Sequence, residues 1–168
     1  MKTNACRLLD ALGIAYETRE YTVDPDDLSG QTVAKKIGLP PEQVFKTLLC
    51  RVDDAKNVFA VLSVADELDF KKLAAAAGGR RAEMVPIKEV QPLTGYIRGG
   101  VTVFGAKKPF PVFAEETIQL FDTISVSAGM RGLQILLSPV SYIRAAEARL
   151  VDLLRPVHSE ELHAEGPL

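Results

Sequence analysis

Two adjacent runs of β-forming residues constrain the fold of this chain more than any other feature. Residues 44–52 and 58–65 are rich in Val, Leu, Phe and Ala, and the charged segment 53–57 separates them. Two apolar runs joined by a short polar turn are typical of a β-hairpin. The sequence therefore predicts a hairpin over residues 44–65.

Helical and strand patterns alternate irregularly around this hairpin. Thr3 is placed to cap a first helix that ends at Gly13, and Asp69 to cap a later one. Residues 91–111 hold several Gly and Pro and are interpreted as functional loops around short strands. The remaining expected elements are strands over 14–21, 83–85 and 149–153, helices over 31–37 and 138–146, and a second hairpin over 123–137.

This order of elements predicts the fold class. A chain of 168 residues suits a single domain. Its strands and helices lack the regular βαβ rhythm of a doubly wound sheet, so we expect an α+β fold with a mixed, barrel-like β-sheet surrounded by several helices. We assign residues 1–153 to this domain and 154–168 to a flexible tail, and we expect a chain cut after about Asp152 to remain active.

Composition excludes several classes of function. The formal net charge is -2, so there is no broad basic surface for DNA or long RNA, and any nucleic acid must be held by a local patch. No segment has the length and apolarity of a signal peptide or a membrane span, so we expect a cytoplasmic protein without a membrane partner. Cys6 and Cys50 form no CxxC pair and are expected to be reduced core thiols.

The position of the two histidines excludes several catalytic mechanisms. His158 and His163 both lie in the expected tail. The body of the chain thus has no imidazole for a Ser-His-Asp or Cys-His triad or for a HExxH zinc site. We expect no metal and no cofactor. Lys, Tyr, Ser, Thr and backbone amides remain, and these groups can stabilise developing negative charge on an activated substrate such as an ester.

Lys46 is the most informative candidate. Strand alternation places it on the same face as Val44, Leu48, Cys50 and Val52, where it interrupts an apolar surface. One interpretation is a lysine near a strand end whose ammonium extends to water. The other is an ammonium directed into a partly dry cavity, where it binds a phosphate or polarises a carbonyl.

Two glycine-containing turns are further candidates. Residues 127–132 hold Ser127, Gly129 and Gly132, and Gly99-Gly100 lies in the turn-rich region. Glycines in such turns let backbone N–H groups converge on an anion or a carbonyl oxygen. The same residues also serve ordinary turns, and no phosphate-loop or dinucleotide fingerprint accompanies them.

Five segments, in order, resemble the YbaK type of Cys-tRNA(Pro) deacylase. They comprise residues 35–40 (KKIGLP), 44–49 (VFKTLL), 68–74 (LDFKKLA), 94–101 (TGYIRGGV) and 126–133 (VSAGMRGL). The resemblance implies the fold of the editing domain inserted in bacterial prolyl-tRNA synthetases. It also implies hydrolysis of cysteine wrongly attached to tRNA(Pro), with the acceptor CCA end as main contact and prolyl-tRNA synthetase as a transient partner.

The resemblance also implies roles for individual residues. Lys46 would be the essential site lysine, with Thr47 beside it. Tyr21, Gly100 and Ser127 match positions that line the family's pocket. The implied mechanism is substrate-assisted, in that the thiol of the cysteine substrate attacks its own ester while Lys46 and backbone groups stabilise the oxyanion.

Two departures from the family pattern bear on specificity. Gln134 stands where the pattern has aspartate, and Met130 replaces a lysine in the glycine turn. Alternatives therefore remain open: a deacylase for Ala-tRNA(Pro) or for a broader set of aminoacyl-tRNAs, a non-catalytic protein that binds aminoacyl or nucleotide ends, or an interaction domain.

Overall fold

The predicted hairpin forms the centre of the fold. The computed structural model describes residues 2–156. In it, β2 (Phe45–Val52) and β3 (Lys56–Ser63) pair antiparallel, with Phe45 opposite Ser63 and Val52 opposite Lys56. The turn is tighter than predicted, because Asp53 and Asp54 adopt left-handed backbone angles with φ of 53° and 58°. Short acidic side chains tolerate this conformation, so the hairpin closes without glycine.

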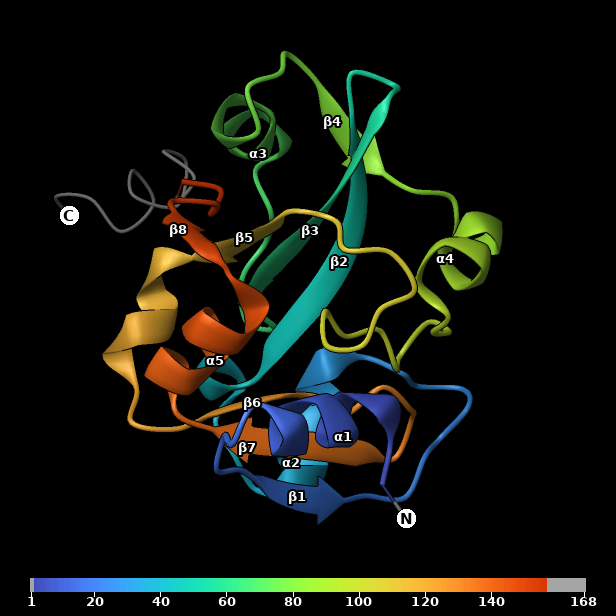
Figure 1. The fold of residues 1–168 in the computed structure, drawn as a ribbon, viewed down its shortest axis with the longest axis vertical. Coiled ribbons are helices and arrows are strands. Elements are labelled where there is room, and N and C mark those ends of the chain that lie inside the picture. Colours follow the sequence, from blue (N-terminus) through green and yellow to red (C-terminus); the bar gives the residue numbers. More distant parts are fainter. Residues whose placement is uncertain (1, 157–168) are drawn as a thin grey trace, which may run out of the picture.

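The hairpin contributes two of the five strands of the larger sheet. The strand order is β4-β2-β3-β5-β8, and β4 (Ala82–Met84) pairs antiparallel with the outer edge of β2. On the other side, β5 (Val112–Glu115) and β8 (Arg149–Val151) run parallel to β3 and to each other (Figure 1). This combination confirms the prediction of a mixed sheet.

A second, smaller sheet holds the other predicted hairpin. Its order is β1-β7-β6, entirely antiparallel, with β1 (Glu17–Glu20), β6 (Ile124–Ser127) and β7 (Leu133–Leu137). Among the described residues, one isolated bridge joins it to the larger sheet, between Val44, just before β2, and Ser125. Because β4 covers β2 only from Cys50 to Val52, the two sheets do not close into a barrel. The fold is thus α+β, as expected, but with two open sheets.

Helices cover the sheets and begin where the sequence predicts. Thr3, Asp69 and Ser138 each accept a backbone N–H at a helix start, as N-cap residues do. Gly38 ends a helix with φ of 76°, in the left-handed conformation that favours glycine. The helices are α1 (Asn4–Ala11), α2 (Gly30–Ile37), α3 (Phe70–Ala76), α4 (Ile87–Thr94) and α5 (Pro139–Ala146), with 3₁₀ turns at Pro41–Gln43 and Glu116–Leu120. None of these described helices has the length and apolar character needed to cross a bilayer.

The prediction for residues 91–111 was wrong in part. The helix α4 continues through Pro92 to Thr94, and residues 95–111 contain no strand. Val90 and Leu93 in α4 pack on the main core, and this packing stabilises a short helix despite its internal proline. The remainder is irregular loop, as expected.

Both faces of the hairpin are buried, each in a different core. Phe45, Leu49 and Phe59 face the main core between the two sheets. Cys50 and Val52 face a second core under α3, so the predicted alternation along β2 is confirmed. Cys6 and Cys50 are both buried free thiols, and burial raises the pKa of Cys50 to about 12. Neither is therefore an activated nucleophile.

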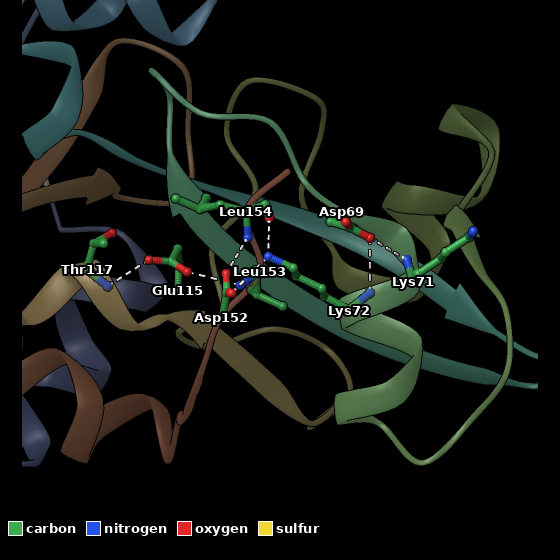
Figure 2. A network of polar contacts seen from close by, with 8 residues as sticks. All are labelled: Asp69, Lys71, Lys72, Glu115, Thr117, Asp152, Leu153 and Leu154. Atoms are coloured by element: carbon green, nitrogen blue, oxygen red, sulfur yellow. Dashed lines mark hydrogen bonds and ion pairs between the residues drawn. The ribbon is translucent and has the colours of Figure 1, made fainter. Parts of the chain in front are cut away.

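The segment after β8 belongs to the fold. Figure 2 shows the buried carboxylate of Glu115, which accepts hydrogen bonds from the backbone N–H of Thr117 at 2.7 Å and of Leu153 at 3.0 Å. The Leu153 carbonyl accepts the N–H of Asp69 at 2.8 Å, and its side chain is fully buried in the second core. Lys72 donates to the Asp152 carboxylate and to the Leu154 carbonyl. The expected tail thus begins later than residue 154, and its remainder beyond Pro156 lies outside the described residues.

Candidate active site

A pocket of about 490 Å³ lies along the outer edge of β2. Its size is that of a small-molecule site. Most of its wall is apolar, and parts of the chain far apart in sequence contribute to it. The lining residues are Leu28, Gly30 and Val33 near α2; residues 44–49 and Val64; Met84, Val85, Ile87 and Val90 around α4; Arg98, Gly99 and Val101; and Ser127 and Gln134.

The edge of β2 that borders this pocket is unpaired at Thr47. The carbonyl of Leu49 accepts the N–H of Val85, so it points away from β3. Backbone groups in an antiparallel ladder alternate in direction, and the N–H and C=O of Thr47 therefore point to the same outer side. Thr47 lies opposite Val61 of β3 on the inner side of β2, but none of the described strands pairs with it on the outer side. The pocket thus offers one free backbone donor and one free acceptor.

Lys46 lines the pocket from the start of β2. Its ammonium donates to the Asp66 carbonyl at 3.0 Å and is half-buried. Burial lowers the pKa of Lys46, while the charges of Asp66 and Glu67 act in the opposite direction. An ammonium has three N–H donors, and one bond to a carbonyl leaves two for a ligand. Lys46 thus presents a half-buried ammonium at the pocket.

Thr47 connects the pocket with the main core. Its side chain lies next to the Tyr142 hydroxyl, which is fully buried and has no hydrogen bond of good geometry among the described residues. Burial raises the pKa of this phenol, so Tyr142 stays neutral. Tyr142 packs edge-on against Phe104, with ring centroids 5.2 Å apart. A neutral, rigid hydroxyl behind Thr47 supports the wall of the pocket.

Gln134 and Ser127 supply polar groups from the smaller sheet. The Ser125 hydroxyl donates to the Gln134 side-chain oxygen at 2.8 Å, deep in the structure. This bond occupies the amide oxygen, so the amide nitrogen is the group that remains for a ligand. The Ser127 hydroxyl accepts the N–H of Gly129 at 3.1 Å, and its own hydrogen is free to donate.

The predicted glycines have different positions. Gly99 lines the pocket, whereas Gly100, Gly129 and Gly132 are not among its lining residues. A Cβ at Gly100 would meet the Met130 Cα at 3.0 Å, so this glycine allows the 97–100 turn to pack against the 128–132 turn. Gly132 accepts the N–H of Tyr21 at 2.9 Å. Tyr21 itself borders a small neighbouring hollow that it shares with Gly99.

The structure thus brings five of the predicted site residues to one pocket. They are Lys46, Thr47, Gly99, Ser127 and Gln134. Arg98 was not predicted as a site residue, although it lies inside one of the segments that carry the family resemblance. The apolar wall from α2 and α4 was not predicted either, because those segments meet β2 only in the folded chain.

The donor set of the pocket does not resemble a metal centre. Among residues 2–156, Lys46 and Arg98 are its only ionised lining residues, and no carboxylate of this range borders it. Across residues 2–156, no cluster of three or more His, Cys, Asp or Glu side chains is arranged to hold a metal ion. The groups present suit hydrogen bonding to a carbonyl oxygen or an anion.

Comparison with known proteins gives the sequence family and the fold that this chain resembles. The sequence model of the aminoacyl-tRNA editing domain matches residues 25–145. A candidate Cys-tRNA(Pro)/Cys-tRNA(Cys) deacylase of Enterococcus faecalis, EbsC, is 38% identical over 90% of this chain and 93% of its own length. The multifunctional Ser/Thr-tRNA deacylase ProXp-y of Escherichia coli K12 is 30% identical over 84% of this chain and 89% of its own.

A solved structure has the same fold. It is that of a candidate trans-editing enzyme for prolyl-tRNA synthetase, which superposes with a TM-score of 0.78 over 93% of this chain and 99% of its own. Its sequence is 20% identical to this one, so the likeness concerns the fold.

Proposed function

Because this chain belongs to the aminoacyl-tRNA editing domain family, we propose that it clears mischarged tRNA(Pro), with Cys-tRNA(Pro) as its principal substrate. The chain is a hydrolase of aminoacyl-tRNA esters. Cysteine, alanine and proline differ too little in volume for one apolar pocket to separate them well, so a second site that checks the product is needed.

The half-buried Lys46 ammonium beside an unpaired strand edge is the observation that carries this proposal. Hydrolysis of an ester passes through a tetrahedral intermediate with negative charge on the former carbonyl oxygen. Lys46 and the Thr47 N–H are both donors at the pocket wall, and preorganised donors in a partly dry site stabilise such an oxyanion strongly. The Thr47 C=O can accept a hydrogen bond from the α-amino group of the amino acid.

The thiol of the cysteine substrate is the proposed nucleophile. Its sulfur attacks the ester carbonyl carbon of the same residue, the bond from that carbon to the ribose oxygen breaks, and the ribose oxygen takes the thiol proton. Water then opens the resulting cyclic thioester to free cysteine. This route uses no imidazole, in keeping with the absence of histidine from residues 2–156.

Ser- or Thr-tRNA is a second candidate substrate. The amide nitrogen that Gln134 leaves for a ligand can donate to a substrate hydroxyl, whereas the family pattern has an acceptor-only aspartate there. The Escherichia coli relative named for Ser/Thr-tRNA deacylation agrees with this possibility. A hydroxyl substrate would require water as the nucleophile.

The acceptor CCA end is the proposed contact on the tRNA. A pocket of about 490 Å³ accommodates an aminoacyl ribose and little more, so most of the tRNA must remain outside it. Recognition of the whole tRNA would then come from prolyl-tRNA synthetase in a transient complex.

Amino-acid release from tRNA(Pro) charged with Cys, Ala, Ser, Thr or Pro tests the proposal. We expect the cysteine ester to be cleared fastest and correctly charged Pro-tRNA(Pro) to be spared. Fast release of Ser or Thr alone would establish the second candidate instead. If a folded protein hydrolysed none of these esters, the chain would be a binding protein.

The lowered pKa of Lys46 predicts a specific pH profile. A lysine is protonated below its pKa, so the ammonium is lost as pH rises through a value below the ordinary 10.5. Ionisation of the substrate thiol raises the rate at lower pH, near 8.5 for an ordinary thiol. We therefore expect a bell-shaped enzymatic rate after subtraction of spontaneous hydrolysis. Lys46→Arg should lack the alkaline fall, and a wild-type rate that climbed steadily to pH 10.5 would contradict this role.

A further inference from the structure

We propose that Arg98 and Arg131 form a phosphate-binding site at the mouth of the pocket, which holds the phosphodiester preceding the aminoacylated ribose. This inference rests on the proposed function, because it assigns a place to the nucleic-acid part of that substrate. It adds a binding site for the RNA backbone to the groups already assigned to the ester.

The charge of the pocket points to an anionic ligand. Within the part of the chain that the structure describes, Lys46 and Arg98 are the only ionised side chains that line it, and both are cationic. The whole chain, in contrast, has a formal net charge of -2. A cleft lined by one sign of charge focuses the local potential, so this part of an acidic molecule attracts anions.

Lys46 and Arg98 differ in how deeply they lie in the pocket, so they suit different parts of a ligand. Lys46 is half-buried and bonded to the Asp66 carbonyl, whereas Arg98 is exposed at the mouth. Neither Arg98 nor Arg131 forms an ion pair with any residue between 2 and 156. Arg98 is therefore free to meet a ligand group that remains outside the pocket.

Arg131 is held beside Arg98 by backbone contacts. Its Nε donates to the Arg98 carbonyl at 2.8 Å, and a Cβ on Gly99 would lie 3.3 Å from that same Nε. The guanidinium thus lies directly against Gly99, which lines the pocket. Because only Nε is used, both terminal nitrogens of Arg131 remain as donors.

Two guanidiniums, of which Arg131 is held by its Nε, suit a phosphodiester better than a carboxyl or carbonyl group. Arginine binds phosphate oxygens through paired N–H donors, and a second arginine can contact the remaining oxygens. The neighbouring hollow contains Asp24 and Asp27, and both already accept hydrogen bonds, Asp24 from the Asp26 N–H and Asp27 from Ser29 and Thr32. Single-stranded acceptor RNA presents a phosphodiester immediately before its terminal ribose, which is the group that reaches the mouth when the ester is inside.

The decisive experiment compares two cysteine esters that differ in phosphate. Wild type, Arg98→Gln and Arg131→Gln are assayed on Cys-tRNA(Pro) and on cysteinyl adenosine, which has no phosphodiester. We expect each variant to raise KM for Cys-tRNA(Pro) about tenfold, as loss of a charged hydrogen bond would, while kcat and the adenosine ester stay within about twofold of wild type. Arg149→Gln, an exposed arginine on the distant strand β8, should change neither substrate.

Salt dependence gives a second measurement. Each lost phosphate contact should reduce the slope of log KM against log salt concentration by about 0.7 for single-stranded RNA. Arg98→Lys and Arg131→Lys keep the charge and should retain most of that slope. Equal losses on both esters would overturn the proposal, and so would an unchanged KM for Cys-tRNA(Pro).

Binding of an uncharged RNA hairpin ending in CCA separates this proposal from the deacylase proposal. Fluorescence anisotropy measures that binding without any hydrolysis. If wild type cleaved neither ester but bound the hairpin with a salt slope that the glutamine variants reduced, the phosphate site would stand and the deacylase proposal would fall. Equal hairpin affinities in wild type and both variants would overturn the phosphate site.

Discussion

Replacing Lys46 with alanine is expected to lower kcat/KM for the cysteine ester by about 10² or more, because one preorganised donor to an oxyanion contributes that much in other hydrolases. The fold should survive. Among residues 2–156 the Lys46 ammonium donates one hydrogen bond, to the Asp66 carbonyl, and removal of a partly desolvated charge costs little. Initial rates on Cys-tRNA(Pro) and thermal unfolding of the same preparations measure both effects.

Two matched variants complete this test. Lys71→Ala removes an exposed lysine from α3, outside the pocket, and should retain full activity. Lys46→Met keeps the length of the side chain and removes its charge, so it should lose as much activity as Lys46→Ala. Unchanged turnover in either Lys46 variant would remove Lys46 from the mechanism.

Removing the C-terminal residues should leave stability unchanged if the chain ends at residue 156, but should lower it if the chain ends at residue 152. A chain of residues 1–156 lacks both histidines but keeps the whole described fold, so we expect wild-type stability and activity. A chain of residues 1–152 also loses Leu153, whose buried side chain fills the second core and whose N–H bonds to the buried Glu115 carboxylate. Loss of a buried leucine costs about 2–5 kcal/mol, and an unsatisfied buried acceptor adds about 1–3 kcal/mol.

Urea unfolding of the two shortened chains beside Leu153→Ala measures this difference. The structure thereby changes the expectation from sequence, which placed a harmless cut after Asp152. A fully stable 1–152 chain would show that the contacts in Figure 2 do not hold the sheet together. Loss of activity in a folded 1–156 chain would instead overturn the histidine-free mechanism.

Local patterns in the sequence predicted the elements well but not their closure. Residues 44–52 form an apolar run typical of a strand, and the capping residues Thr3 and Asp69 mark helix starts. The hairpin and these helices could therefore be predicted. Whether β2 is paired on its outer edge depends on where β4 and β6 end, which no local pattern contains. For that reason the mixed, barrel-like sheet could be expected from the sequence, but its division into two open sheets could not.

In the candidate site, too, residues with a local sequence signal could be predicted, whereas those brought in by folding could not. Lys46 stood out because a charge interrupts an apolar strand face, Ser127 because it begins a glycine-containing turn, and Gln134 only through the family resemblance. Arg98 lies in a loop whose course is set by backbone contact between the 97–100 and 128–132 turns. The apolar wall from α2 and α4 consists of ordinary Leu, Val and Ile side chains, which carry no functional signal until the chain has folded.

The pairing of β1 with β7 has a consequence for how this protein folds. Residue Glu17 lies opposite Leu136, so the first strand of the chain finds its partner near the far end of the described sequence. During synthesis β1 therefore stays unpaired until almost all of the domain has been translated. Contacts between such distant residues slow folding relative to proteins with local contacts. The N-terminal segment is thus the part of the nascent chain that stays available longest for binding by chaperones or by other unpaired strands.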